Sequence, residues 1–237
     1  MNGDRRFPIA QVALVGLFMT ALVTAQLTAT KILAFPVPAS LPVVGSSVIL
    51  PGASLAIAVM FFTSDCYAEL YGRGAAQVLV NVGFAMNFVL LSLVWSTILA
   101  PAAPSSVDPS AFATVLGAST NIVIGSLVAY IVSQNFDVIA FHALREFTDG
   151  RHLWLRNIGS TATSQAIDTV IFVGVAFFLA PTVLGFGSAL PVSIIIPLII
   201  GQYLLKLLIA LLDTPVVYLV VGLAGGREPE TPRISVD

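Results

Sequence analysis

The chain has 237 residues, of which 57% are hydrophobic and 9% are charged, and its formal net charge is −2. Soluble domains carry about 25% charged residues, so this composition predicts a multispanning membrane protein without a sizeable soluble domain. The small net charge and the lack of a basic stripe argue against nucleic-acid binding. The single cysteine, Cys66, excludes an internal disulfide framework.

Long apolar stretches recur along the chain, and a membrane-spanning helix needs about 20 mostly apolar residues. Six stretches qualify and predict an all-α integral membrane fold: 8–34, 47–70, 75–100, 111–135, 157–180 and 191–223. They form one expected domain over residues 1–224, followed by a polar tail, 225–237, that is expected to be disordered. The first stretch is longer than the apolar core of a signal peptide, so we expect it to be retained; a cleaved signal peptide is the alternative.

Arginines mark one side of this bundle. They fall at the N-terminus, in the second and fourth connections and in the tail: Arg5, Arg6, Arg73, Arg145, Arg151, Arg156, Arg227 and Arg233. The first, third and fifth connections carry neither Lys nor Arg. By the positive-inside rule, both termini are expected to be cytoplasmic.

Ionisable residues lie within or close to the apolar stretches: Lys31, Asp65, Glu69, Asp168, Lys206 and Asp213. Each such charge costs about 2.5–3.5 kcal/mol at the centre of a membrane, so intramembrane charges point to function. At a rise of about 1.5 Å per residue, Asp168 and Lys206 both lie near the midplane. The alternatives are a structural ion pair between these two residues and, for Lys31, a side chain that reaches outward to water.

The fifth stretch carries a polar stripe, because Thr161, Ser164, Gln165 and Asp168 follow the spacing of one helix face. Gln202 and Lys206 repeat this pattern on the sixth stretch, and Asn87 adds an amide from the third. A carboxylate can accept two N–H groups side by side, as a guanine-like edge offers them. We therefore expect a solute-binding chamber that contains Asp168, Gln165, Ser164, Thr161, Asn87 and Lys206. Hydroxyls bonded to their own helix and an interhelical role for Asn87 are the alternatives.

Asp65 and Glu69 are four residues apart near the inner end of the second stretch, so they share a helix face. We expect them to form a cytoplasmic gate, held by Arg73 or by the region of Arg145. A capping role at the membrane interface and direct contact with the substrate are the alternatives.

The first stretch has a face of small residues four apart, which includes Ala21, Ala25 and Ala29. Such faces let helices approach closely in lipid. The partner is either another helix of this chain or another subunit, in a homo-oligomer or a complex with a different protein.

Enzyme chemistry is not indicated. His142 and His152 lie ten residues apart with no cysteine nearby, whereas a zinc site needs three or four ligands. Ser160 has no histidine in a later span to act as base, and no Gly-rich phosphate loop exists. We therefore expect no metal, no cofactor and no ATP hydrolysis by the chain itself.

Three segments resemble signatures of the YhhQ/VUT family of queuosine precursor transporters, formerly described as vitamin uptake transporters. "TSDCYAELYG" resembles its "TD…E.YG" signature, "QNFDVIAFHALRE" a "Q..D…F..L(R/K)" segment, and "RHLWLRNIGSTATSQAIDT" its "LW.RN..ST..SQ..DT" signature. The positions that match are Asp65, Glu69, Tyr71, Asn157, Ser160, Thr161, Ser164, Gln165 and Asp168. The segment after "YG" departs from the family, because it holds only Arg73 where several basic residues are common.

The resemblance implies six helices in the inner membrane and uptake of a 7-deazapurine, typically 7-cyano-7-deazaguanine, for tRNA modification. It also implies a fold similar to the substrate-binding S-components of ECF transporters, whose first helix docks through an Ala-xxx-Ala face like Ala21, Ala25 and Ala29. An S-component-like subunit that needs a separate energising module is therefore the alternative to a stand-alone importer.

Overall fold

The computed structural model describes residues 9–41, 45–148 and 153–223 of the chain. Within these ranges some side chains are not described, among them those of Arg145, Asn157 and Asp213. The expectations for these three side chains, and for the tail after residue 223, therefore lie outside the described residues.

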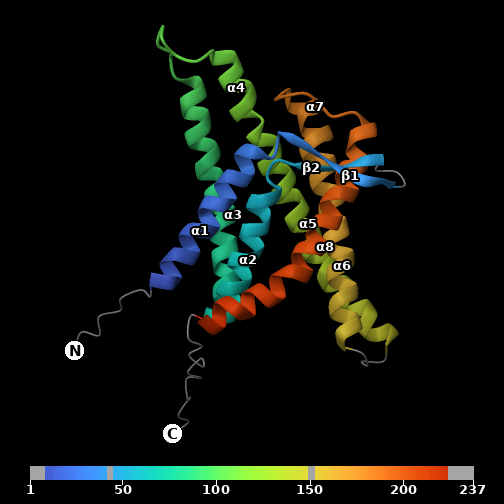
Figure 1. The fold of residues 1–237 in the computed structure, drawn as a ribbon. Coiled ribbons are helices and arrows are strands. Elements are labelled where there is room, and N and C mark those ends of the chain that lie inside the picture. Colours follow the sequence, from blue (N-terminus) through green and yellow to red (C-terminus); the bar gives the residue numbers. More distant parts are fainter. Residues whose placement is uncertain (1–8, 42–44, 149–152, 224–237) are drawn as a thin grey trace, which may run out of the picture.

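The described residues form a helical bundle with one β-hairpin (Figure 1). In chain order the elements are α1 (Ile9–Thr28), β1 (Ile32–Leu41), β2 (Gly45–Pro51), α2 (Ser54–Tyr71), α3 (Arg73–Leu99), α4 (Pro109–Gly117), α5 (Ser119–Phe147), α6 (Leu153–Gly174), the π-helical turn η1 (Val175–Leu179), α7 (Ala180–Leu184) and α8 (Val192–Leu223).

The predicted membrane-spanning architecture is confirmed in outline. Within the described residues, five helical segments are long and apolar enough to cross a membrane: Ile9–Thr28, Arg73–Leu99, Pro109–Leu144, Ile158–Leu184 and Val192–Val217. The remaining predicted span corresponds to α2, which has 18 residues and carries Asp65 and Glu69.

The first connection differs from the prediction, because residues 32–41 and 45–51 pair as an antiparallel hairpin, with Ile32 opposite Pro51. The first helix therefore ends at Thr28 rather than near 34, and the second begins at Ser54 rather than near 47. β-Branched and aromatic residues favour strands, and proline, which has no backbone N–H to donate, is tolerated on edge strands. Because the hairpin has only two strands, both are edges.

The hairpin packs tightly against α8. A Cβ atom built on Gly201 would collide with the carbonyl oxygen of Ile49, so only glycine allows this approach of backbone to helix. A backbone hydrogen bond closes the base of the hairpin: the N–H of Gly52, just after β2, donates to the carbonyl of Lys31, just before β1, at 2.6 Å.

The small-residue face of α1 packs inside the bundle. Ala21, Ala25 and Ala29 are 6%, 7% and 0% exposed, and Ala25 and Ala29 belong to a core that includes Ile122 and Phe172. Of the two alternatives for Ala21, Ala25 and Ala29, packing against other helices of this chain is the one that the structure shows. Docking of another subunit through this face is not shown.

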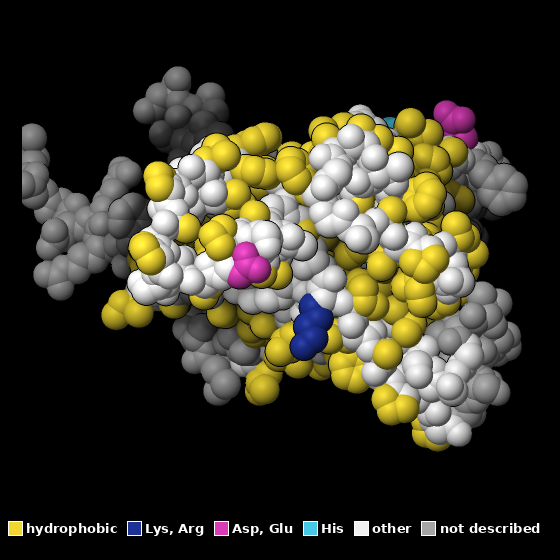
Figure 2. All heavy atoms as spheres, turned by 90° about the horizontal axis from the view of Figure 1, so that it is seen from above, with side chains coloured by type: hydrophobic (Ala, Val, Ile, Leu, Met, Phe, Trp, Pro, Cys, Tyr) yellow, Lys and Arg dark blue, Asp and Glu magenta, His cyan; other side chains and the backbone are white. Residues whose placement is uncertain are grey.

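The arginine-bearing connections gather at one end of the bundle. The start of α1, the α2–α3 junction, the α5–α6 turn and the end of α8 lie at the lower end in Figure 1, and the α3–α4 link lies at the upper end. Seen from above, the upper face is mostly hydrophobic and uncharged, with few charged side chains (Figure 2). This arrangement agrees with the charge asymmetry of the sequence; that the lower end is cytoplasmic remains a prediction.

Candidate functional site

A cavity of about 340 Å³ lies in the centre of the bundle. Its wall contains residues of α1, α2, α3, α5, α6 and α8, so helices far apart in the sequence enclose it. The polar residues of the wall are Gln26, Ser64, Gln77, Ser126, Tyr130, Ser133, Gln134, Gln165, Asp168, Gln202 and Lys206. Ligand sites occupy about 300–1,000 Å³, so the cavity has the size of a small-molecule site.

An ion pair stands in this wall. The ammonium Nζ of Lys206 on α8 lies 2.5 Å from Oδ2 of Asp168 on α6, and their side chains are 8% and 23% exposed. Ser133 on α5 donates a hydrogen bond to Oδ1 of Asp168 at 3.2 Å. Buried charges of this kind are retained only when they are paired. The Asp168 carboxylate nevertheless remains partly exposed in the cavity wall.

Three glutamine side chains in the same wall have unused hydrogen-bonding capacity. The carbonyl oxygens of Gln26, Gln165 and Gln202 are buried, and none has a hydrogen-bond partner within the described part of the chain. Leaving a buried polar atom unpaired costs about 1–3 kcal/mol, so such atoms call for an explanation. These amides come from α1, α6 and α8 and converge on one space.

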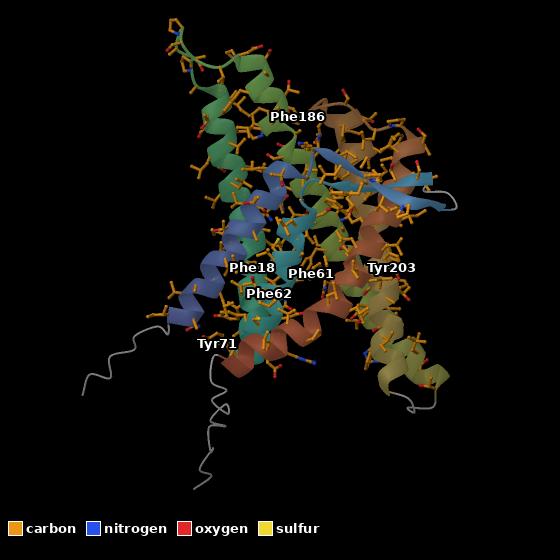
Figure 3. The ribbon with its side chains drawn as sticks, viewed as in Figure 1. Phe18, Phe61, Phe62, Tyr71, Phe186 and Tyr203 are labelled. Carbon is orange, nitrogen blue, oxygen red and sulfur yellow. The ribbon has the colours of Figure 1, made fainter. Side chains whose placement is uncertain are left out.

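Aromatic rings supply the rest of the wall. Phe84 and Tyr130 lie with ring centroids 4.1 Å apart and planes 33° apart, and the Tyr130 hydroxyl accepts a hydrogen bond from Gln77 at 2.9 Å. Phe18, Phe61 and Phe172 also line the cavity. In Figure 3, Phe18 lies on α1 and Phe61 lies midway along the bundle between α2 and α8. Flat rings beside carboxylate and amide groups favour a planar solute with polar edges.

A second cavity of about 450 Å³ adjoins the first. Phe61, Gln165 and Lys206 line both cavities, whereas Asp65 and Thr161 line only the second. The remaining wall of the second cavity is apolar: Ile158, Ala162, Leu207, Ile209 and Ala210.

The structure brings together only part of the predicted binding set. Asp168, Gln165 and Lys206 line the central cavity, and Thr161 lines the second. Ser164 turns toward α5, where it donates to Asp137 at 3.1 Å, and it lines neither cavity. Asn87 is 1% exposed and also lines neither cavity; its amide has no partner among the described residues.

The predicted gate residues are likewise divided. Asp65 lines the second cavity, but Glu69 and Arg73 are exposed near the α2–α3 junction and line no cavity. Among the described side chains, no ion pair joins Arg73 to Glu69 or Asp65. The latch between α2 and Arg73 stays a prediction, and the side chain of Arg145 lies outside the described residues.

Sequence reasoning missed Gln26, Tyr130 and Ser133 as site residues, and it named Gln202 only as part of a polar pattern. Gln26 carried a usable signal, because a glutamine inside an apolar span is costly unless it finds a partner or a function. Ser133 and Tyr130 gave no such signal, since both residue types are common in transmembrane helices and only the packing of α5 against α6 places them.

A multispanning helix bundle around a solute-sized cavity, with a largely apolar wall and a few convergent polar groups, fits a membrane transport protein. Residues 51–220 match the family described as "Putative vitamin uptake transporter", and the chain belongs to this family, the YhhQ/VUT family predicted from its motifs. It is thus a multi-pass membrane protein of a transporter family and not an enzyme.

The chain is 36% identical over 160 residues to a protein of Bacillus subtilis (strain 168) named "Probable queuosine precursor transporter". The aligned region covers 67% of this chain and 66% of that protein. No solved structure matches the chain, so the predicted similarity to S-components of ECF transporters stays a prediction.

Proposed function

We propose that this protein imports a queuosine precursor of the 7-deazapurine type, such as 7-cyano-7-deazaguanine, through the inner membrane for tRNA modification. The central observation is the convergence of one carboxylate and three incompletely bonded amides on a single aromatic-lined cavity. The name of the Bacillus subtilis relative supports the same class of solute.

Asp168 is the anchor of the proposed site. The pyrimidine edge of a 7-deazaguanine presents a ring N–H beside an exocyclic amino group, and a carboxylate accepts such a pair side by side. Hydrogen bonds to a charged group contribute about 1.5–3 kcal/mol each, more than those between neutral groups. In the solute-free arrangement, Lys206 and Ser133 occupy these acceptor positions.

The glutamines complete the recognition. An amide can present either its oxygen or its NH₂ group after rotation about its last bond, so Gln26, Gln165 and Gln202 can meet both donors and acceptors of a fused ring. Bound solute would supply the partners that their carbonyl oxygens lack. Phe84 and Tyr130 offer ring surface for the faces of the base.

A stand-alone importer is favoured over an S-component-like subunit. The feature that suggested a docking partner, the face of Ala21, Ala25 and Ala29, is buried within the chain. Import of a base that is then consumed by tRNA modification requires no ATPase in the same complex.

Uptake of a labelled 7-deazapurine by cells unable to synthesise it tests the proposal. We expect the wild type to restore uptake and Asp168→Asn to reduce it at least tenfold, since about 1.4 kcal/mol is a factor of ten. Asp108→Asn is the matched control, because Asp108 is an exposed cap of α4 far from the cavity lining. Uptake by Asp168→Asn at the wild-type rate would refute the site.

A further inference from the structure

The two cavities share part of their walls. On α2, Ile57, Met60 and Ser64 line only the central cavity, Phe61 lines both, and Asp65 lines only the second. The wall of α2 thus passes from one cavity to the other between Phe61 and Asp65.

The same transition occurs on the other two helices. On α6, Asp168 lines the central cavity, Gln165 lines both, and Ile158 lines the second. On α8, Gln202 lines the central cavity, Lys206 lines both, and Ala210 lines the second. Each helix therefore contributes one residue to the boundary: Phe61, Gln165 and Lys206.

The directions of the helices show that the cavities are stacked along the bundle. The second cavity uses later residues of α2 and α8 but earlier residues of α6. α2 and α8 descend in Figure 1 while α6 ascends, so all three place the second cavity nearer the lower end. This is the end at which the arginine-bearing connections gather.

We propose that Phe61, Gln165 and Lys206 form a gate between an upper binding chamber and a lower exit chamber. This inference rests on the transport function and gives the second cavity a role in it. Phe61 contributes an apolar ring, and Lys206 is held in the boundary layer by its ion pair with Asp168.

The gate responds to solute because the solute and the ammonium of Lys206 compete for the carboxylate of Asp168. A solute that donates its N–H groups to Asp168 displaces the ammonium of Lys206, which cannot remain unpaired in a buried position without a large cost. Lys206 also lines the lower chamber, whose wall contains the carboxylate of Asp65. Binding above therefore weakens the contact that holds the boundary closed and favours movement of Lys206 toward the lower chamber.

Thiol accessibility tests the gate without any solute. In a Cys66→Ala background, Ser126→Cys places a reporter in the upper chamber and Ala162→Cys places one in the lower chamber. Both side chains are partly exposed in the structure. A membrane-impermeant maleimide is applied from the side on which Ala162→Cys reacts. With the open state populated at about 10% or less, we expect Ser126→Cys to react at least tenfold more slowly from that side.

Opening the boundary should remove this difference. Phe61→Ala is expected to raise the reaction rate of Ser126→Cys about tenfold or more, while Phe62→Ala, which changes a neighbouring ring outside both cavity walls, leaves it unchanged. Gln165→Ala is the second gate variant, used if Phe61→Ala does not yield folded protein. Equal reactivity of the two reporters in the unmodified gate, or no response to either gate variant, would overturn the proposal.

The probe needs no deazapurine, so this experiment and the uptake assay fail independently. If Phe61→Ala raises the reporter's reaction rate but the protein does not transport deazapurines, the gate is supported and the proposed substrate is refuted.

Discussion

Lys206 on α8 and Asp168 on α6 face each other across the wall of the central cavity, with Nζ 2.5 Å from Oδ2. The pair joins α6 to α8, and its two residues lie 38 positions apart in the sequence. The ion pair has two effects. It neutralises two buried charges, and it occupies the carboxylate that is proposed to hold the solute. Variants that preserve neutrality should therefore restore stability without restoring transport.

Asp168→Asn alone leaves the ammonium of Lys206 without its counter-charge. We expect a loss of about 3 kcal/mol, the lower end of the range for broken buried pairs, because Asp168 retains 23% exposure. The double variant Asp168→Asn/Lys206→Met should recover most of this loss in a thermal unfolding assay in detergent, yet still fail to transport. Transport by the double variant at the wild-type rate would contradict the role of the carboxylate.

Gln26→Leu and Gln202→Leu separate binding from packing. Each removes an amide whose carbonyl oxygen has no partner, so we expect unchanged or slightly increased stability. Each should also weaken deazapurine binding about fivefold, the effect of a hydrogen bond of about 1 kcal/mol. Asn135→Leu is the control, because Asn135 is exposed and bonds the carbonyl of Ile131 in its own helix. If either glutamine served to hold helices together, its leucine variant would instead be less stable and would bind the deazapurine with unchanged affinity.

Gly83→Val tests whether the central cavity is the binding chamber. A Cβ atom at Gly83 would lie 2.8 Å from Cε1 of Phe18, a ring in the cavity wall, so a larger side chain must displace that ring. We expect at least tenfold weaker binding, measured by titration calorimetry, with the helix content retained in circular dichroism. Gly74→Ala is the control, because a Cβ atom there meets nothing within 4 Å. Normal affinity in Gly83→Val would place the solute elsewhere.

Gly201→Ala tests the unexpected hairpin. Its methyl group would collide with the carbonyl oxygen of Ile49, which belongs to the backbone of β2 and cannot rotate away. Overpacking of this kind costs about 1–3 kcal/mol, so the unfolding temperature should fall. Gly16→Ala on α1 meets nothing within 4 Å and should have no such effect. If both variants melt alike, the hairpin does not pack on α8 as described.

The sequence predicted the helices, and it offered the Asp168–Lys206 ion pair as an alternative to a binding role, because both depend on composition and periodicity. Asp168 and Gln165 stood out as polar residues in an apolar span, and their neighbours in space follow from the packing of α6 against α8. The hairpin could not be predicted, since its prolines resemble a loop and its register depends on contact with α8.

The distribution of the polar stripe on α6 also needed the structure. One broad face of α6 carries Thr161, Ser164, Gln165 and Asp168. α5 covers part of this face, and there Ser164 donates a hydrogen bond to Asp137. The break between the two cavities at Gln165 then assigns Thr161 to the lower one. Helical spacing gives a common face, whereas the neighbouring helices decide which part of that face meets a solute.

The most direct measurement compares the affinity of the purified protein for 7-cyano-7-deazaguanine with its affinity for the same base lacking the 2-amino group. If Asp168 accepts that amino group, the wild type should lose about tenfold or more in affinity on its removal, while Asp168→Asn loses far less, because hydrogen bonds to charged groups contribute about 1.5–3 kcal/mol. Equal losses in the two proteins would show that Asp168 does not meet the pyrimidine edge and would contradict the account.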